Sequence, residues 1–433
     1  MRKIIVAGAG HGGLSAAIQL AKAGYDVTVY EQHKREGIGH DWHDCMTPKT
    51  FEQLGIEMPD ESEYMLTPAM RYNPPSKKKQ IWNGKQWMTG FISVDRKALY
   101  RQILKKCDEA GVKLCFETTV LGSVFDKEKL VGIRIKDKDG ERVEKADLII
   151  DAAGMNSPVR RSLRQCCGIK NCLTEAETFY VYRAYFENTS GKETEELYNV
   201  YLFHNDNPGM DWVISNTAFY DILIGSFIPL TDEIIEKAIA DFREEYPFMG
   251  EKLLRGGYQA RIPLLNPLSK YVYDNYAAVG DSAGMTEPMS GSGIDLSLRA
   301  GKILADTVIA IGDGEYTTEA LWKYQYEYAK TNAHYYSDNN LRKMLEGLNG
   351  GIIDDFIVNE VITDKEISSG GLKIESVTEA LQKAKGFIPH ADILPGILTM
   401  MKRDGILKEV KETMPEEYSE EAFEVWKQLY EQL

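Results

Sequence analysis

The first thirty-one residues constrain the fold of this chain more than any other stretch. Lys3 to Ala7 is a largely apolar run that predicts a buried parallel strand. It leads into Gly8-Ala9-Gly10-His11-Gly12-Gly13, a G-x-G-x-x-G turn, and then into a predicted helix from Leu14 to Ala23. In such a turn Gly8 permits a tight bend, Gly10 lets a pyrophosphate approach the backbone, and Gly13 lets the helix pack closely on the sheet.

A second predicted strand, Asp26 to Tyr30, ends next to Glu31. A carboxylate at this position accepts hydrogen bonds from the hydroxyls of an adenosine ribose and repels a 2′-phosphate. The N-terminus of the helix between the two strands favours phosphate, because its N–H groups are unpaired and the helix dipole is positive there. The stretch therefore predicts a site for an adenine dinucleotide without a 2′-phosphate, and leaves open whether that is NAD or FAD.

Length and charge exclude several classes of function. The chain has 433 residues, enough for two or three domains, and a formal charge of -15 that argues against a nucleic-acid partner. It contains no apolar run near the roughly twenty residues that span a bilayer, and its N-terminus lacks a cleavable signal pattern. Six cysteines suit a reduced compartment. We therefore predict a cytoplasmic protein with at most peripheral membrane contact.

A second stretch of the same kind occurs late in the chain. The predicted strand at Tyr276 to Val279 ends in Gly280-Asp281, and Gly291-Ser292-Gly293-Ile294 opens a predicted helix that runs to Ile311. An acid at the carboxyl end of a strand binds ribose or ribityl hydroxyls, and N–H groups flanked by glycine face a flavin edge. Between the two stretches, Asp151 to Arg161 also has the pattern of a strand end followed by an Arg-bearing helix start, which favours phosphate.

Two clusters of polar residues raise the question of a metal. Residues 39 to 45 contain two histidines, two aspartates and Cys45, and a second cluster consists of Cys166, Cys167 and Cys172. Neither has the ligand spacing of a zinc or iron–sulfur site. We predict no metal, an active-site loop for the first cluster, and ordinary thiols for the second.

The remaining segments divide the chain. Short strands rich in tyrosine, phenylalanine and valine between residues 179 and 227 predict a mostly antiparallel sheet, and strands within 64–93, including Trp87 and Met88, are expected to belong with it. The predicted fold class is α/β, with a Rossmann-type dinucleotide-binding domain, an inserted antiparallel substrate domain and a helical C-terminal region. The expected boundaries are 1–63, 94–172 and 266–312 for the first, 64–93 and 173–265 for the second, and 313–433 for the third.

The glycine turn, Glu31, the helix with Arg96, the segment from Asp151 to Arg160 and the Gly280-Asp281 stretch together resemble FAD-dependent oxidoreductases of the para-hydroxybenzoate hydroxylase fold. Within them the chain is most similar to the geranylgeranyl reductases, which saturate isoprenoid double bonds. The resemblance covers about residues 1 to 312. It implies FAD as the cofactor.

The resemblance also implies roles for particular residues. Gly8, Gly10 and Gly13 would hold the FAD pyrophosphate and Glu31 the adenosine ribose. Arg96 would lie near the phosphates or the ribityl chain. On the flavin side it implies Gly280 and Asp281 at the ribityl chain, and Gly291, Ser292, Gly293 and Ile294 at the pyrimidine edge.

Two residues are expected on the substrate side. Some of these reductases carry a cysteine near the flavin, for which Cys45 is the counterpart, and an aromatic stretch in the substrate domain, of which Trp212 is the residue that matches. Hydroxylases of the fold usually carry Asp-Gly where this chain has Ala153-Gly154, a difference that weakens the interpretation as an NADPH-dependent hydroxylase.

The leading hypothesis is therefore an FAD-dependent reductase of a carbon–carbon double bond in a hydrophobic small-molecule substrate, with isoprenoids as a candidate class. The electron donor, NAD(P)H or ferredoxin, stays undecided. One alternative is a flavin monooxygenase, an NAD(P)H-dependent hydroxylase of an aromatic or apolar substrate. The other is a non-catalytic flavin-bearing interaction protein whose C-terminal helices bind a partner.

Overall fold

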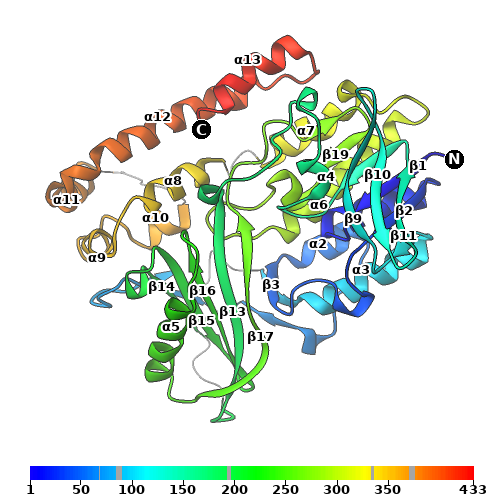
Figure 1. The fold of residues 1–433 in the computed structure, drawn as a ribbon. Coiled ribbons are helices and arrows are strands. Elements are labelled where there is room, and N and C mark those ends of the chain that lie inside the picture. Colours follow the sequence, from blue (N-terminus) through cyan, green and yellow to red (C-terminus); the bar gives the residue numbers. More distant parts are fainter. Residues whose placement is uncertain (68, 84–89, 193–196, 333–335, 370–375) are drawn as a thin grey trace.

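The computed structural model describes residues 1–67, 69–83, 90–192, 197–332, 336–369 and 376–433 (Figure 1). A six-stranded sheet contains the N-terminal strand, in the order β18-β19-β12-β1-β2-β8, and is parallel apart from the β18–β19 pair. Its strands are β1 (Lys3–Ala7), β2 (Asp26–Tyr30), β8 (Lys113–Cys115), β12 (Leu148–Asp151), β18 (Val272–Tyr273) and β19 (Tyr276–Ala278). The predicted bounds of β1 and β2 are confirmed.

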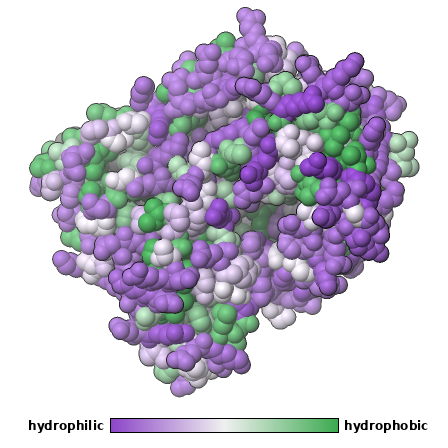
Figure 2. Space-filling model, in the orientation of Figure 1, coloured by the Kyte–Doolittle hydropathy of each residue, from purple (hydrophilic) through white to green (hydrophobic). Residues whose placement is uncertain are grey.

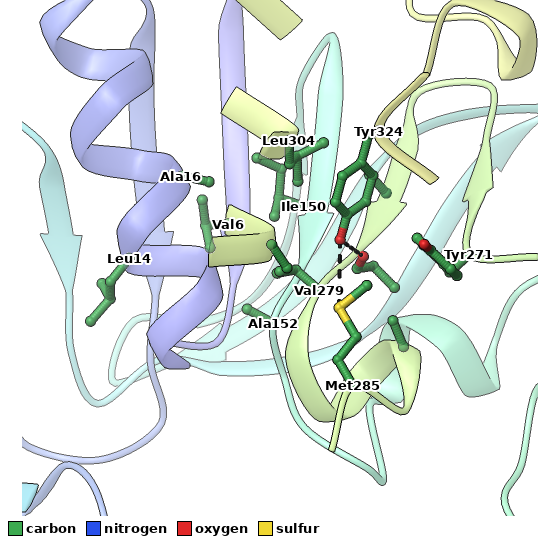
Figure 3. Packing of buried hydrophobic residues seen from close by; sticks show 14 of the residues in the cluster. Val6, Leu14, Ala16, Ile150, Ala152, Tyr271, Val279, Met285, Leu304 and Tyr324 are labelled. Carbon is green, nitrogen blue, oxygen red and sulfur yellow. Dashed lines mark hydrogen bonds between the residues drawn. The ribbon is translucent and has the colours of Figure 1, made fainter. Parts of the chain in front are cut away.

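Helices cover this sheet. Helix α1 (His11–Lys22) packs against α3 (Arg96–Ala110) and α6 (Ile294–Ile311), and α7 (Thr318–Asn332) packs against α6. Helix α6 has its predicted bounds, whereas α1 begins at His11 instead of Leu14, so the last two glycines of the turn lie inside the helix. Figure 3 shows Val6, Leu14 and Ala152 in the resulting core, where the Tyr324 hydroxyl donates to the Ala278 carbonyl oxygen over 2.9 Å.

A seven-stranded sheet forms the second large element, in the order β17-β13-β16-β15-β14-β5-β6. It is antiparallel except where β14 pairs with β5, which is a parallel pair. Helix α5 (Asp232–Glu245) covers one face and buries Ile235, Ala238 and Phe242 against it. The strands are β5 (Ala69–Asn73), β6 (Ile81–Asn83), β13 (Thr178–Asn188), β14 (Leu197–Leu202), β15 (Gly209–Ser215), β16 (Phe219–Ser226) and β17 (Met249–Pro263).

Two three-stranded sheets complete the β-structure. One is a meander of β9 (Thr119–Asp126), β10 (Lys129–Asp137) and β11 (Gly140–Lys145). The other has the order β3-β7-β4 and consists of β3 (His43–Met46), β4 (Tyr64–Leu66) and β7 (Ile92–Asp95). The strands expected within 64–93 thus divide between two sheets, because β4 pairs with β7 while β5 and β6 join β14. Trp87 and Met88 lie outside the described residues.

The C-terminal region is helical, as the sequence predicts. In Figure 1 its helices cross the top of the seven-stranded sheet and reach the edge of the molecule farthest from the N-terminus. They are α8 (Tyr336–Glu346), α9 (Gly350–Val358), α10 (Asp364–Ser369), α11 (Val377–Phe387), α12 (Leu394–Thr413) and α13 (Glu420–Tyr430); two further helices, α2 (Pro48–Leu54) and α4 (Pro158–Arg161), follow β3 and β12.

Candidate cofactor and substrate site

The glycine turn leaves no room for side chains. A Cβ atom at Gly8 or Gly10 would lie 2.7 Å from the carbonyl oxygen of Ala152, and one at Gly13 would lie 2.5 Å from the Ala152 Cβ atom. Gly8 also has a φ of 84°, which favours glycine. Helix α1 starts directly after Gly10, so its first N–H groups have no partner within the helix. The turn therefore presents bare backbone at the positive end of a helix.

The Glu31 carboxylate ties the end of β2 to this turn. One oxygen accepts the Ala9 N–H over 2.9 Å, and the other accepts the His33 N–H over 2.9 Å and lies 2.6 Å from the His33 Nδ1 atom. The residue is 8% exposed. Its role toward the ribose stays a prediction.

The second predicted stretch packs against the start of α1, where a Cβ atom on Gly12 would lie 2.5 Å from the Val279 side chain. Gly280 and Asp281 follow β19, and a Cβ atom on Gly293 would lie 3.7 Å from an Asp281 carboxylate oxygen. Burial raises the pKa of Asp281, and the positive charges of Arg96 and Arg160 oppose that rise. Helix α6 begins after Gly293, so a second set of unpaired N–H groups lies beside Asp281.

Arg96, the predicted phosphate or ribityl contact, is bound to Asp44. Its Nε and Nη2 atoms lie 2.5 and 2.6 Å from the two carboxylate oxygens of Asp44. Burial would raise the pKa of Asp44, but the Arg96 guanidinium outweighs that effect and lowers it to about 2. Arg160, by contrast, is buried and donates to the carbonyl oxygens of Met155, Asn171 and Ser282, so here it stabilises the loop rather than offering a phosphate contact.

His11 is a site residue that the sequence reasoning missed. Its ring lies 4.4 Å from the Tyr100 ring, and burial, followed by the Arg96 charge, lowers its pKa to about 3, so it is neutral at physiological pH. Its Nε2 atom is buried and has no hydrogen-bond partner in the part of the chain that the structure describes. A histidine inside a G-x-G-x-x-G turn was the available signal.

Cys45 and Trp212, the two predicted substrate-side residues, both lie near one tyrosine, Tyr198. The Trp212 ring meets the Tyr198 ring edge-on at 5.1 Å. Burial raises the pKa of Tyr198 well above its usual value, and the nearby Cys45 thiol raises it further. Cys45 itself lies 3.7 Å from the Thr67 hydroxyl. Tyr198 was not singled out from the sequence, because a tyrosine in a tyrosine-rich sheet carries no distinctive pattern.

Strand β3 connects the two halves of the site. Successive side chains of a strand point to opposite sides, so Asp44 and Cys45 face different ways. Asp44 binds Arg96 and influences His11, while Cys45 faces Thr67 and the Tyr198 region. Figure 2 shows a recess near the middle of the molecule, over the junction of the seven-stranded sheet with the α2 and β3 region.

A buried ion pair anchors the seven-stranded sheet to β3. Arg183 lies 2.9 and 2.6 Å from the two carboxylate oxygens of Asp221, and its Nη1 atom donates to the His43 carbonyl oxygen over 2.5 Å. Its guanidinium also lies 4.7 Å from the Trp212 ring centre. Burial lowers the pKa of Arg183, but the Asp221 carboxylate outweighs this effect, so the pKa of Arg183 is raised overall.

The Cys45 thiol should react slowly with alkylating reagents. Burial raises its pKa to about 11, so at pH 8 only a small fraction is thiolate. We expect its modification by iodoacetamide, followed by peptide mass spectrometry, to accelerate roughly tenfold per pH unit from pH 8 to 10. For free cysteine, whose pKa is about 8.5, the alkylation rate levels off once the pH rises above that value. An equally early plateau at Cys45 would contradict the buried, protonated thiol.

The polar clusters weighed as metal sites show ordinary surroundings. His40 stacks on Trp42 at 4.3 Å, and all six cysteines are free thiols, with Cys166 and Cys172 exposed and Cys167 buried. Within the described ranges, no three or more His, Cys, Asp or Glu side chains are grouped so that they could hold a metal ion. Likewise, no helix in the described part of the chain is both long and apolar enough to cross a membrane.

Comparison with known proteins agrees with this geometry. Residues 3–156, which include the glycine turn, Glu31 and Arg96, match the family model described as FAD dependent oxidoreductase. The chain is an FAD-dependent oxidoreductase. Its cofactor is FAD, which settles the choice that the glycine turn left open, and the alternative of a non-catalytic interaction protein is therefore dropped.

Relatives of this oxidoreductase extend over most of its length. It is 21% identical to the digeranylgeranylglycerophospholipid reductase of Sulfolobus acidocaldarius over 94% of this chain and 89% of that one. It is 25% identical to the menaquinone reductase of Mycolicibacterium smegmatis over 76% and 81%. A geranylgeranyl bacteriochlorophyll reductase-like structure from Thermoplasma acidophilum superposes with a TM-score of 0.73 and 18% identity, covering 91% and 99% of the two chains. The predicted fold class is confirmed.

The surroundings of the glycine turn fit an FAD diphosphate. Ala152 packs so closely on Gly8, Gly10 and Gly13 that only bare backbone fits there, and the N-terminus of α1 supplies unpaired N–H groups of the kind that a pyrophosphate binds. The Nε2 atom of His11, which is buried and without a hydrogen-bond partner in the described part of the chain, would be a further donor beside them in the tautomer that carries its one N–H there.

Proposed function

We propose that this oxidoreductase saturates a carbon–carbon double bond in a hydrophobic, isoprenoid-type substrate. The observation that carries the proposal is the position of strand β3 between two groups of residues. On one side of the strand Asp44 binds Arg96, a predicted cofactor contact, and on the other side Cys45 lies near Tyr198 of the seven-stranded sheet. Relatives named as reductases of digeranylgeranylglycerophospholipid and of menaquinone, both polyprenyl compounds, support the same substrate class.

We propose the following contacts for FAD. We assign the pyrophosphate to Gly8, Gly10 and Gly13, with His11 as an added donor, and the adenosine ribose to Glu31. We assign the ribityl side to Arg96, Gly280 and Asp281. The backbone of Gly291, Ser292, Gly293 and Ile294 at the start of α6 would face the pyrimidine edge, where its N–H groups stabilise negative charge. When bound and reduced, FAD supplies the hydride for one alkene carbon.

The substrate would lie against the face of the seven-stranded sheet that looks toward β3. Trp212, Val200, Ile214 and Met70 form an apolar cluster on this face, with Tyr198 and Leu223 packed beside it. Apolar side chains of this kind suit a prenyl chain, which has few polar groups to satisfy. The second alkene carbon needs a proton, and the Cys45 thiol, which stays protonated because its pKa is about 11, is our candidate donor.

The proposal is tested under anaerobic conditions. The bound flavin is reduced in turn with NADH, NADPH and reduced ferredoxin, which identifies the donor, and each sample is then mixed with an unsaturated polyprenyl glycerophospholipid or a menaquinone. We expect substrate-driven flavin reoxidation and a product heavier by two hydrogens. Flavin that stays reduced with the substrate and is reoxidised only after oxygen is admitted, with a hydroxylated product and NAD(P)H consumption, would favour the monooxygenase alternative instead.

Replacing Cys45 with alanine should slow turnover about a hundredfold, a typical loss for a general acid, without lowering the FAD content. The matched control is Cys115→Ala, which removes a partly buried thiol from β8 of the six-stranded sheet and should leave turnover unchanged. Turnover is measured as product per flavin. If Cys45→Ala is as active as the control, the proton comes from another group, and the reductase proposal itself is unaffected.

A further inference from the structure

Trp42, the residue before β3, has a buried indole N–H group without a hydrogen-bond partner in the part of the chain that the structure describes. The residue is 3% exposed. Trp322 and Trp426 are buried as deeply, but their N–H groups donate to the carbonyl oxygens of Pro415 and Val410 over 2.8 and 2.9 Å. Buried donors are almost always paired, because an unpaired one costs free energy. The Trp42 N–H group therefore indicates an acceptor that the described residues do not supply.

The Trp42 ring is held in a fixed position. The His40 ring stacks on it at 4.3 Å with an angle of 12° between the two planes, and the Tyr258 ring lies 5.5 Å away at 18°. The backbone is fixed as well, since the Trp42 carbonyl oxygen accepts the Arg96 N–H over 2.9 Å. One residue earlier, the Asp41 N–H donates to the Tyr258 hydroxyl over 2.8 Å. Packing of this kind holds a donor in place before its ligand binds.

The surroundings of Trp42 include contacts that we assign to the flavin half of FAD, which is the ribityl chain with the isoalloxazine ring. The Arg96 guanidinium, assigned to the ribityl side, lies 5.6 Å from the Trp42 ring centre. Trp42 also belongs to an apolar cluster with Leu264, and Ile262 packs against that cluster. A Cβ atom on Gly291, assigned to the pyrimidine edge, would lie 3.5 Å from Ile262 and 3.9 Å from Leu264. Trp42 thus lies near the ribityl contact and, through two apolar side chains, near the pyrimidine contact.

The chemistry of the N–H group selects its ligand. An indole N–H donates and cannot accept, so its partner must present an acceptor. A prenyl chain has none, whereas the flavin half of FAD carries ribityl hydroxyls and ring carbonyls. We propose that the Trp42 N–H donates a hydrogen bond to an oxygen atom of this half of FAD. The inference rests on the FAD contacts proposed above and holds whether the enzyme is a reductase or a monooxygenase.

A change of one ring atom tests the proposal. Replacing Trp42 with 3-benzothienylalanine puts sulfur where the indole has N–H, so the ring keeps its stacking on His40 and loses the donor. The full-length protein is freed of FAD and titrated with it in a calorimeter. We expect the Kd of FAD to rise about tenfold, because an oxygen of the bound cofactor is left without its partner. Trp42→Phe, which also lacks the N–H group, should give at least the same loss.

Two controls separate this hydrogen bond from an effect on the fold. ADP, which carries the adenine half alone, should bind with an unchanged Kd, since the glycine turn and Glu31 are not altered. The same replacement at Trp322 removes the hydrogen bond to the Pro415 carbonyl oxygen. It should lower the melting temperature and leave the Kd of FAD unchanged.

Three results would overturn the proposal. The first is an unchanged Kd of FAD in the Trp42 variants. The second is an equal loss of affinity for FAD and for ADP, which would show that Trp42 acts through the nucleotide turn. The third is an unchanged Kd of FAD with a raised KM for the alkene, which would assign the N–H group to the substrate. An enzyme that saturates no alkene would count against the proposed reaction instead, and the FAD titration would still decide the role of Trp42.

Discussion

Replacing Gly10 with alanine is expected to abolish retention of FAD and to lower the free energy of unfolding by about 1–3 kcal/mol. The added Cβ atom would lie 2.7 Å from the Ala152 carbonyl oxygen. That oxygen cannot easily retreat, because the Ala152 N–H is held by the Ala7 carbonyl over 2.8 Å at the end of β1. The turn would have to move, and with it the backbone that we assign to the pyrophosphate.

The flavin content of the purified variant and its affinity for added FAD measure this effect. We expect at least a tenfold loss of affinity. Gly37→Ala is the matched control, since a Cβ atom at Gly37 meets nothing within 4 Å and the residue does not have a positive φ. Retention of FAD by Gly10→Ala at the level of Gly37→Ala would exclude the turn as the pyrophosphate site.

Arg183→Met is expected to be the most destabilising single change of charge in the chain, with a loss of about 3–5 kcal/mol. It would leave Asp221, whose side chain is fully buried, without its counter-charge. It would also remove the hydrogen bond to the His43 carbonyl that fixes the start of β3. The consequence for function is a misplaced Cys45, so we expect a raised KM in whatever folded protein remains.

Urea unfolding followed by circular dichroism measures this loss. The double variant Arg183→Met/Asp221→Leu should recover part of it, because no unpaired charge stays buried. A surface pair provides the control: Lys302 and Asp306, with side chains 42% and 58% exposed, lie 2.6 Å apart, and Lys302→Met should cost less than about 0.5 kcal/mol. A loss for Arg183→Met as small as this control would show that the buried pair contributes no stability.

Local sequence patterns were enough to predict much of the secondary structure of the nucleotide-binding half. The glycine spacing and the apolar runs predicted the bounds of β1, β2 and α6, because each of these signals lies within a few residues. The start of α1 was predicted three residues late. Glycine has a low helix propensity, but here Gly12 and Gly13 are inside the helix because Val279 and Ala152 pack too closely on it for any side chain.

The substrate half depended on contacts between distant segments. Cys45 and Trp212 were identified through the resemblance, but Tyr198, which lies near both, comes from β14 and meets them only in the folded chain. The pairing of β5 with β14, more than 120 residues apart, is likewise invisible to any local pattern. The pairing of strands that are far apart in the sequence depends on how whole sheet faces pack. The alternation of apolar and polar residues along a single strand does not specify its partner.

The sequence by itself thus predicted an adenine-dinucleotide site near the N-terminus of this FAD-dependent oxidoreductase, because a glycine turn and a terminal acid act through backbone geometry within thirty residues. Only the tertiary structure decided that Asp44 and Cys45, adjacent in the chain, face different partners. Side chains alternate along β3, but the sequence does not say that Arg96 lies on the Asp44 side and Thr67 on the Cys45 side. The same holds for α12. Apolar residues lie on both of its faces, and only the burial of Leu407 and Val410 shows which face is left outside.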